Sequence, residues 1–505
     1  MNAPGGRDGG HRGKQGKQDG QHNTQRGPHR GPRPRSAQRP SERTRRADPA
    51  RQAAYDTLRA VAEEDAYANL VLPRLLRERR VSGRDASFAT ELTYGALRMR
   101  GLYDAVLAAC VDRPLDDLDA GVLEALRLGA HQLLGMRVPA HAAVGETVGL
   151  VRANIGQGPG GLVNAVLRRV GEADAETWTQ RVAPPAEEDP LGHLAVADSH
   201  PAWVVRALRE SLAGRGVPAD RLFPELHDLL QADNERPEVT LVARPGLAEV
   251  AELVESGGTP GRWSPTAVRW PSGDPGSVRA VREGRAGVQD EGSQLVALAL
   301  VAAPLDGRDE RWLDLCAGPG GKAGLLGAIA AQRGARLTAV EQAPHRADLV
   351  RSAVAALGET VEVRTADGRE VGADEPGGYD RVLVDAPCTG LGALRRRPEA
   401  RWRREPSDLT GLAPLQRALL GSALDAVRPG GLVAYVTCSP HLAETRLVVD
   451  DVVRRRGDVE VLDAVPLVRQ SDGGPVPGTG PGPTVQLWPH RHGTDAMFLA
   501  LLRRS

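Results

Sequence analysis

The chain has 505 residues, 41% of them hydrophobic, and its 65 Lys and Arg residues balance its 65 Asp and Glu residues. A chain of this length can bury a large core and should contain two or three domains. It has neither the apolar core of a signal peptide nor a run of about 18 apolar residues, which predicts a cytoplasmic protein with no membrane span. The four cysteines form no CxxC or clustered Cys/His pattern, so no metal site is expected.

The N-terminal segment differs sharply in composition from the rest. Residues 1–47 hold twelve Lys or Arg and three Asp or Glu, a charge of +9 that the remainder balances with −9. Because the segment is rich in Gly, Pro and Gln and poor in large apolar residues, residues 1–48 are expected to be a disordered basic tail. Two interpretations stay open for it, a solubilising tail and a non-specific RNA-binding arm.

Apolar residues recur at helical spacing through residues 50–172, which predicts an all-α bundle. Residues 173–198 are polar, acidic and proline-bearing, and we expect a linker there. Residues 199–290 mix short strand patterns, at 239–243 and 266–270, with a helical pattern at 247–255. That mixture predicts a small α+β subdomain.

From residue 291 to residue 505 strand and helix patterns alternate, which predicts a Rossmann-like α/β domain with a mostly parallel sheet. Ligands of such sheets bind beyond the carboxyl ends of the strands. The expected strands cover residues 312–316, 336–341, 361–365, 380–385, 432–437, 459–464 and 496–501. The expected helices cover residues 321–333, 345–356, 409–427 and 443–455, and residues 470–483 should form a mobile loop.

A glycine-rich loop, Asp-Leu-Cys-Ala-Gly-Pro-Gly-Gly-Lys at residues 314–322, follows the first of these strands and opens a helix. Glycines let the backbone approach a ligand closely, and the helix start offers free N–H groups. Glu341 ends the next strand 20 residues after Gly321, where an acid that binds a ribose is expected. Asp367 ends the third strand and would suit an adenine amino group, although a plain turn aspartate is the alternative.

Two cysteines follow neighbouring strands of the expected sheet. Asp385-Ala-Pro-Cys388 places a carboxylate and a thiol after one strand, and Cys438 closes the next. A thiolate is a good nucleophile toward a weakly electrophilic ring carbon, and a second thiol can act as base or proton shuttle. The pattern therefore indicates covalent catalysis on a pyrimidine ring, whereas Cys316 and Cys110 are expected to serve packing.

An arginine-rich segment follows the Cys388 turn directly. Guanidinium groups bind phosphate in bidentate fashion, and Arg or Trp faces can stack on unpaired bases. We therefore expect an RNA-binding role, with a solvated charge run as the alternative. The residues concerned are Arg395, Arg396, Arg397, Arg401, Arg403 and Arg404.

Taken together, these motifs resemble the Sun-type family of RNA cytosine-C5 methyltransferases, and most closely its bacterial small-subunit ribosomal RNA methyltransferase B group. The resemblance rests on residues 288–295, 314–322, 380–390 with Arg396 and Pro398, 437–439 and 492–498. Residues 50–172 are similar to the NusB fold, a helical RNA-binding module, through residues 88–98 and 162–168. The continuation after Cys438, Ser-Pro-His-Leu-Ala-Glu, departs from the Glu-Glu-Asn usual in the family, and Arg244 stands where an Arg-x-Asn pattern is expected.

The resemblance implies S-adenosylmethionine as cofactor and RNA, most of all 16S ribosomal RNA, as partner, for a monomeric enzyme. It implies that Cys438 attacks C6 of a flipped cytosine, that Asp385 contacts the ring N3, and that Cys388 promotes product release, with Lys322 in a positioning role. The cofactor-binding residues that it implies are Cys316, Ala317, Gly318, Pro319, Gly320, Gly321, Lys322, Glu341, Arg346, Asp367 and Asp385. Two alternatives stay open: the same chemistry on transfer RNA, and a non-catalytic RNA-binding scaffold.

Overall fold

The computed structural model describes residues 48–136, 138–271 and 273–505. The expectation of a disordered tail at residues 1–48 therefore lies outside the described residues, except for Asp48. That residue begins the first helix, because its carboxylate accepts a hydrogen bond from Arg51 N at 2.8 Å and Pro49 occupies the first helical position.

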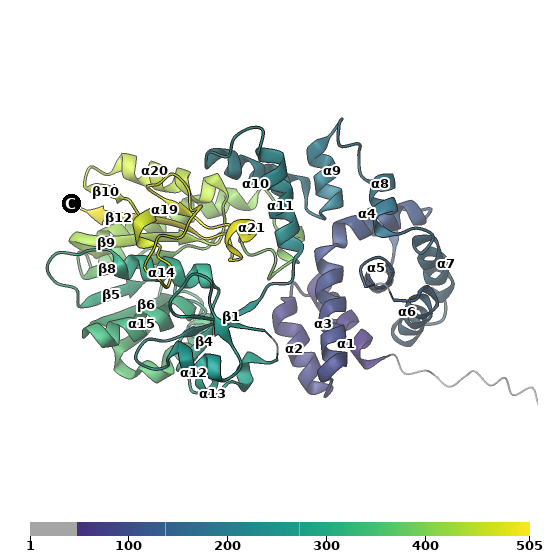
Figure 1. Cartoon of the computed structure of the whole chain (residues 1–505), viewed down its shortest axis with the longest axis horizontal. Coiled ribbons are helices and arrows are strands. Elements are labelled where there is room, and N and C mark those ends of the chain that lie inside the picture. The colour runs from purple at the N-terminus through teal and green to yellow at the C-terminus, as the bar shows by residue number, and fades with distance from the viewer. Residues whose placement is uncertain (1–47, 137, 272) are drawn as a thin grey trace, which may run out of the picture. The chain divides into compact units, whose positions relative to one another are not determined.

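The N-terminal domain is a helical bundle, as the apolar periodicity predicts (Figure 1). Its core joins apolar side chains of successive helices around α5, whose residues are buried along most of its length. The helices are α1 (Pro49–Glu63), α2 (Ala68–Glu78), α3 (Gly83–Arg98), α4 (Arg100–Cys110), η1 (Leu115–Asp117), α5 (Ala120–Leu134), α6 (Ala140–Asn154) and α7 (Gly160–Val170).

The segment expected to be a linker is helical instead. It contains α8 (Ala175–Val182) and α9 (Pro190–Ala197), and Trp178 packs into the helical core with its indole N–H donated to Val170 O. The acidic residues that suggested a linker cap these helices, since Asp174 and Asp189 accept backbone hydrogen bonds in the first turns. The expectation of an irregular connection between residues 173 and 198 was therefore wrong.

The following subdomain starts with α10 (Ala202–Gly214) and α11 (Leu222–Asn234) and continues as a small antiparallel sheet. The strand order is β2-β3-β1-β4, and the two strands expected from the sequence are β1 and β3. The sheet elements are β1 (Val239–Ala243), α12 (Val250–Glu255), β2 (Thr259–Pro260), β3 (Ala267–Trp270), η2 (Pro275–Ser277), α13 (Arg279–Arg282) and β4 (Ala286–Val288).

The C-terminal domain is built on a second sheet with strand order β10-β12-β9-β8-β5-β6-β7, and β11 pairs with β12. The run from β9 to β7 is parallel, whereas β10, β11 and β12 pair in antiparallel fashion, which confirms the mostly parallel, Rossmann-like sheet. The strands are β5 (Arg311–Asp314), β6 (Arg336–Glu341), β7 (Val361–Thr365), β8 (Tyr379–Asp385), β9 (Val427–Thr437), β10 (Val459–Leu462), β11 (Val485–Gln486) and β12 (Phe498–Arg504).

Helices cover both faces of this sheet (Figure 1). On one face lie α14 (Glu291–Ala302), α15 (Gly321–Arg333) and α16 (Pro344–Val354). On the other lie α17 (Val371–Asp374), α19 (Asp408–Ala426) and α20 (Arg446–Arg455). The remaining short elements are η3 (Ala355–Thr360), α18 (Ala400–Arg403), η4 (Leu442–Glu444), η5 (Val465–Leu467) and α21 (Pro489–His492).

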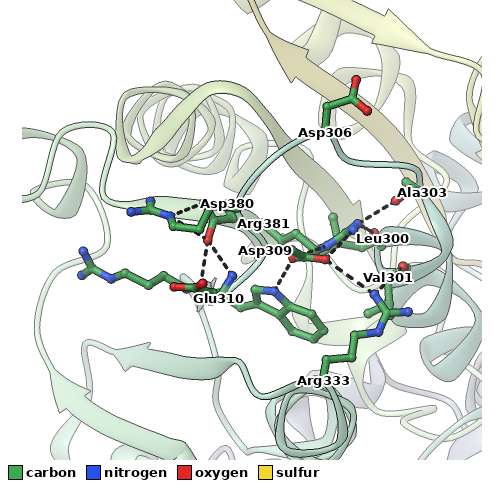
Figure 2. Close-up of polar contacts among 12 residues, drawn as sticks. Leu300, Val301, Ala303, Asp306, Asp309, Glu310, Arg333, Asp380 and Arg381 are labelled. Atoms are coloured by element: carbon green, nitrogen blue, oxygen red, sulfur yellow. Dashed lines mark hydrogen bonds and ion pairs between the residues drawn. The ribbon is translucent and has the colours of Figure 1, made fainter.

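Ion pairs stabilise the amino ends of the central strands (Figure 2). The carboxylate of Asp380, at the start of β8, is fully buried and accepts hydrogen bonds from Arg308, Arg428 and the backbone N–H groups of residues 310 and 311. Arg381 binds Asp309 through two parallel hydrogen bonds of 2.9 Å. Every one of these buried charges has an opposite charge beside it.

Candidate active site

The two cysteines expected at the carboxyl edge of the sheet lie together. Cys388 follows β8 and Cys438 follows β9, and these strands are parallel neighbours in register, with Asp385 opposite Val436. The two Sγ atoms are 3.5 Å apart and both residues are half-buried. The contact with Cys438, together with burial, raises the pKa of the Cys388 thiol well above its ordinary value.

Lys322 lies beside these thiols, at the start of α15. Its Nζ is 2.7 Å from Asp385 Oδ2. Burial alone would lower the pKa of Lys322, but the charges of Asp385 and Cys438 outweigh it and raise that pKa. Lys322 is also the last of the chain's three lysines, after Lys14 and Lys17, whereas every other basic site uses arginine or histidine. That compositional signal marks a position where a compact ammonium group matters.

Asp314 and Cys316 lie beneath the glycine-rich loop. Asp314 ends β5 and is completely buried, and burial together with the nearby Asp385 raises its pKa to about 7. Burial likewise raises the pKa of Cys316 well above its ordinary value, in keeping with the packing role expected for it. The site therefore contains one buried and one half-buried aspartate, Asp314 and Asp385, near a single lysine.

The glycine-rich loop fits a nucleoside-type ligand. A Cβ atom at Gly318 would lie 2.2 Å from Glu341 Oε2, and Gly320 has a φ of +108° with Ala353 packed against it, so larger side chains do not fit. Glu341 accepts hydrogen bonds from the backbone N–H groups of Gly318 and Ala343. Its remaining carboxylate lone pairs can accept two ribose hydroxyls. The observed loop thus suits S-adenosylmethionine.

Arg346 and Asp367 lie at the outer side of the same loop. Arg346 donates to Gly318 O at 2.7 Å and lies 3.6 Å from Glu341, so it also holds the loop in place. Asp367 forms an ion pair with Arg369, which lowers its pKa, and it also accepts from Gln342. Contact between Asp367 and an adenine would require this ion pair to rearrange.

A buried acid that the sequence analysis did not select lies next to the thiols. Glu444, in η4, accepts hydrogen bonds from the backbone N–H and the hydroxyl of Thr389, the residue after Cys388. Gln416 of α19 donates to Glu444 and to Pro387 O. In the sequence, the segment 439–444 stands out only as a departure from the usual family pattern, and no local signal points to Gln416.

The arginine-rich segment is mostly structural, which corrects the expectation that all six arginines bind RNA. Arg395 and Arg396 form a buried cluster with Asp290 and Asp495. Arg403 donates to the carbonyls of residues 61 and 66 in the helical domain. These three side chains therefore form contacts between segments that are far apart in the sequence.

Arg401 is the most deeply buried of the six, with no exposed surface. Its guanidinium donates to the carbonyls of Arg98, Ser199 and Asp233 and to the side chain of Asn234. Burial lowers the pKa of Arg401 to about 10. The remaining two differ from it, since Arg397 is exposed and Arg404 is partly exposed.

Arg244, the departure noted in β1, is also structural. Its buried guanidinium donates to Gly284 O and to Ala353 O of the C-terminal domain. Among the residues that the structure describes, no helix is long and apolar enough to cross a membrane. Within those same residues, no group of three or more His, Cys, Asp or Glu side chains is arranged to hold a metal ion.

A mostly parallel Rossmann-like sheet with a glycine-rich loop after its first strand is the architecture expected of an S-adenosylmethionine-dependent methyltransferase. Family models agree: "16S rRNA methyltransferase RsmB/F" matches residues 300–503 and "NusB family" matches residues 48–172. The chain belongs to the RsmB/F methyltransferase family and carries an N-terminal NusB domain. The resemblance stated from the sequence is thereby confirmed.

Individual relatives cover almost the whole chain. A Mycobacterium tuberculosis protein provisionally named as a methyltransferase is 55% identical over 92% of this chain and 98% of its own length. The ribosomal RNA small subunit methyltransferase B of Pseudomonas syringae is 31% identical over 90% of this chain and 96% of its own length. The crystal structure of PH0851 has the same fold, with a TM-score of 0.72 and 23% identity over 90% of this chain and 98% of that one.

Proposed function

We propose that this protein forms 5-methylcytosine in 16S ribosomal RNA through a covalent cysteine adduct. The observation that carries the proposal is the pair of thiols 3.5 Å apart, beside the Lys322–Asp385 ion pair and the glycine-rich loop. Cytosine C5 is a poor nucleophile until a thiolate adds to C6, so the reaction needs a cysteine that can attack the ring. The relatives named for small-subunit ribosomal RNA support the choice of substrate.

In the first step Cys438 Sγ attacks C6 of a cytosine that has left its stack, and the electron pair of the C5–C6 double bond moves toward C5. Asp385 contacts the ring N3, and the Lys322 ammonium bound to Asp385 offsets the negative charge that develops on the ring. Extruding the base costs least from a loop or single strand.

S-adenosylmethionine, when bound, would supply an electrophilic methyl group to the activated C5 and would leave as S-adenosylhomocysteine. Residues 316–322 would hold the methionine and phosphate-free nucleoside part of the cofactor, with Glu341 on the ribose and Asp367 near the adenine. Asp385 and Arg346 complete this set at its two sides.

Release of the product requires loss of the C5 proton. Cys388 first loses its own thiol proton to solvent, and the resulting thiolate accepts the C5 proton. The C5–H electron pair restores the C5–C6 double bond, and the C6–S bond breaks to return the thiolate of Cys438. Forming the adduct removes the influence of Cys438 that raises the pKa of Cys388, so the base becomes available when it is needed.

The helical domain, the exposed Arg397 and the partly exposed Arg404 are proposed to bind the RNA around the target base. The basic segment 1–47 could add non-specific affinity, and the monomeric state and cytoplasmic location stay predictions. Transfer RNA as substrate is the main alternative, and a non-catalytic RNA-binding scaffold is the other. A scaffold has no need of the paired thiols.

Bisulfite sequencing of RNA from cells with and without the gene tests the proposal. One ribosomal 5-methylcytosine should disappear without the gene and return with the wild type, but not with Cys438→Ser, because a hydroxyl lacks the accessible anion of a thiol. Removing a covalent nucleophile lowers kcat by about 10⁶-fold in the best-studied enzymes, which here means background level. Loss at a transfer RNA site would change the substrate, and no change at any cytosine would favour the scaffold.

A further inference from the structure

We propose that Glu444 is a positioning residue for product release, which holds the Cys388 turn in register with the nucleophile Cys438. The inference rests on the proposed function, because it assigns a role within that reaction. It adds a residue to which neither the motifs nor the family resemblance gives a role.

Glu444 connects the two cysteine loops directly. It lies six residues after Cys438, and its Oε1 accepts the backbone N–H of Thr389 at 2.7 Å while its Oε2 accepts the Thr389 hydroxyl at 2.5 Å. Glu444 and Thr389 are almost completely buried, so water does not replace these bonds. A carboxylate that receives two donors from one residue fixes both the position and the orientation of that residue.

Other contacts hold Glu444 itself in place. Tyr435 of β9 donates its hydroxyl to Glu444 O at 2.8 Å. Gln416 of α19 spans from Glu444 Oε1, at 3.2 Å, to Pro387 O, at 2.8 Å. The turn that carries Cys388 is therefore held on both sides, at residue 387 and at residue 389, by one buried network that starts from the Cys438 loop.

The charge of Glu444 also bears on the chemistry of Cys388. Its carboxylate adds to the effect of Cys438, of burial and of Asp385 in raising the pKa of the Cys388 thiol, whereas Cys438 interacts with the Lys322 ammonium. The Glu444 carboxylate thus favours the protonated form of the Cys388 thiol in the resting site.

Glu444→Gln is the informative substitution, because it keeps the shape but places an NH₂ group or a weaker acceptor against the donors of Thr389 and Gln416. Attack by Cys438 should survive, whereas release should slow by about 10²-fold, the lower end of what a positioned proton-transfer group contributes. A covalent RNA–protein adduct should then accumulate. Thr389→Val removes only the hydroxyl donor and should cause a smaller accumulation.

The experiment incubates the full-length protein with S-adenosylmethionine and transcribed 16S ribosomal RNA, and quantifies denaturation-resistant adduct and methylated product together. Cys388→Ala should trap adduct and Cys438→Ser should form none. Glu399→Gln is the matched control, since Glu399 is a buried acid that accepts a backbone N–H, from Ala68, outside this network. It should leave the adduct at the wild-type level.

Accumulated adduct in Glu444→Gln or Thr389→Val, with wild-type behaviour of Glu399→Gln, supports the inference. If Cys388→Ala traps adduct but Glu444→Gln and Thr389→Val do not, Glu444 has no role in release and the inference is wrong while the proposed function stands. If Cys388→Ala traps no adduct, the proposed release step fails and the inference fails with it. If Glu444→Gln does not fold in a thermal melt, Thr389→Val decides.

Discussion

The two ends of the central strands carry buried aspartates that behave in opposite ways. At the amino end, Asp380 is surrounded by donors, and although burial alone would raise its pKa, these hydrogen bonds hold it below the ordinary value (Figure 2). At the carboxyl end, burial and the neighbouring Asp385 raise the pKa of Asp314 to about 7. The negative charge of a buried aspartate is thus fully compensated at the amino end of the strands and only partly compensated at the carboxyl end.

We interpret this difference as one between an ion network that holds the fold and the candidate catalytic site. Arg308 and Arg428 both pair with Asp380, whereas Lys322 pairs with Asp385 and is the cation that acts on Asp314. A region that only has to hold a fold gains from complete pairing. Catalytic sites, which handle charged intermediates, generally keep the pKa values of their ionisable groups near neutral pH.

The largest effect is expected when Lys322 is removed from the carboxyl end of the strands. Lys322→Met should lower the methylation rate by about 10²–10³-fold, the usual cost of losing one preorganised electrostatic group. Lys322→Arg should restore only part of the rate, because a planar guanidinium cannot take the place of a compact ammonium in a buried site. Single-turnover methylation of 16S ribosomal RNA measures both, and full activity of the arginine variant would contradict this role.

At the fully paired end the expected effect is on stability. Asp380→Asn leaves Arg308 and Arg428 without their shared charge and should lower the free energy of unfolding by about 3 kcal/mol, the scale for breaking a buried ion pair. S-adenosylmethionine affinity should stay unchanged, because the substitution lies at the opposite edge of the sheet. Urea unfolding measures the change in stability, and calorimetric titration measures the cofactor affinity. Weakened cofactor binding in the folded variant would contradict the second part of the prediction.

The smallest effect is a difference in pH dependence. A buried acid whose folded pKa is raised costs stability as pH rises from its unfolded value toward its folded value, so wild type should lose about 1.4 kcal/mol relative to Asp314→Asn between pH 6 and pH 8. The lowered pKa of Asp380 has the opposite sign. Its contribution is present at neutral pH and is lost only as pH falls through that lowered pKa.

Unfolding midpoints of wild type and both variants at pH 6 and pH 8 measure this difference. Relative to wild type, Asp314→Asn should gain stability over this interval, and Asp380→Asn should show a constant loss. Equal behaviour of the two variants would remove the distinction between the two ends of the sheet.

Local sequence patterns were sufficient for the catalytic sheet and for the meeting of the two cysteines. Hydrophobic runs marked the strands, and parallel neighbours place their carboxyl ends at one edge, so residues after β8 and β9 had to lie close together. The glycine-rich loop and Glu341 followed from the same geometry. The assignment of catalytic roles to these residues stays a prediction.

Long-range contacts explain what the sequence did not predict. Arg401 looks like a surface residue in its local context, and its burial depends on carbonyl groups 167 to 303 positions away. Gln416 and Glu444 meet across 28 residues, with no periodic pattern to connect them. The linker expectation failed because composition alone does not distinguish an acidic linker from short helices capped by aspartates.

The burial of Arg401 has a consequence for the modularity of the chain. A fragment starting at residue 291 would keep this guanidinium but lose its partners at Arg98, Ser199 and Asp233, and would expose the segment that leads to Cys388. The C-terminal domain therefore depends on contacts with the helical domain, and the two are not independent modules. Any natural or engineered exchange of that domain has to reproduce the carbonyl groups that receive this one side chain.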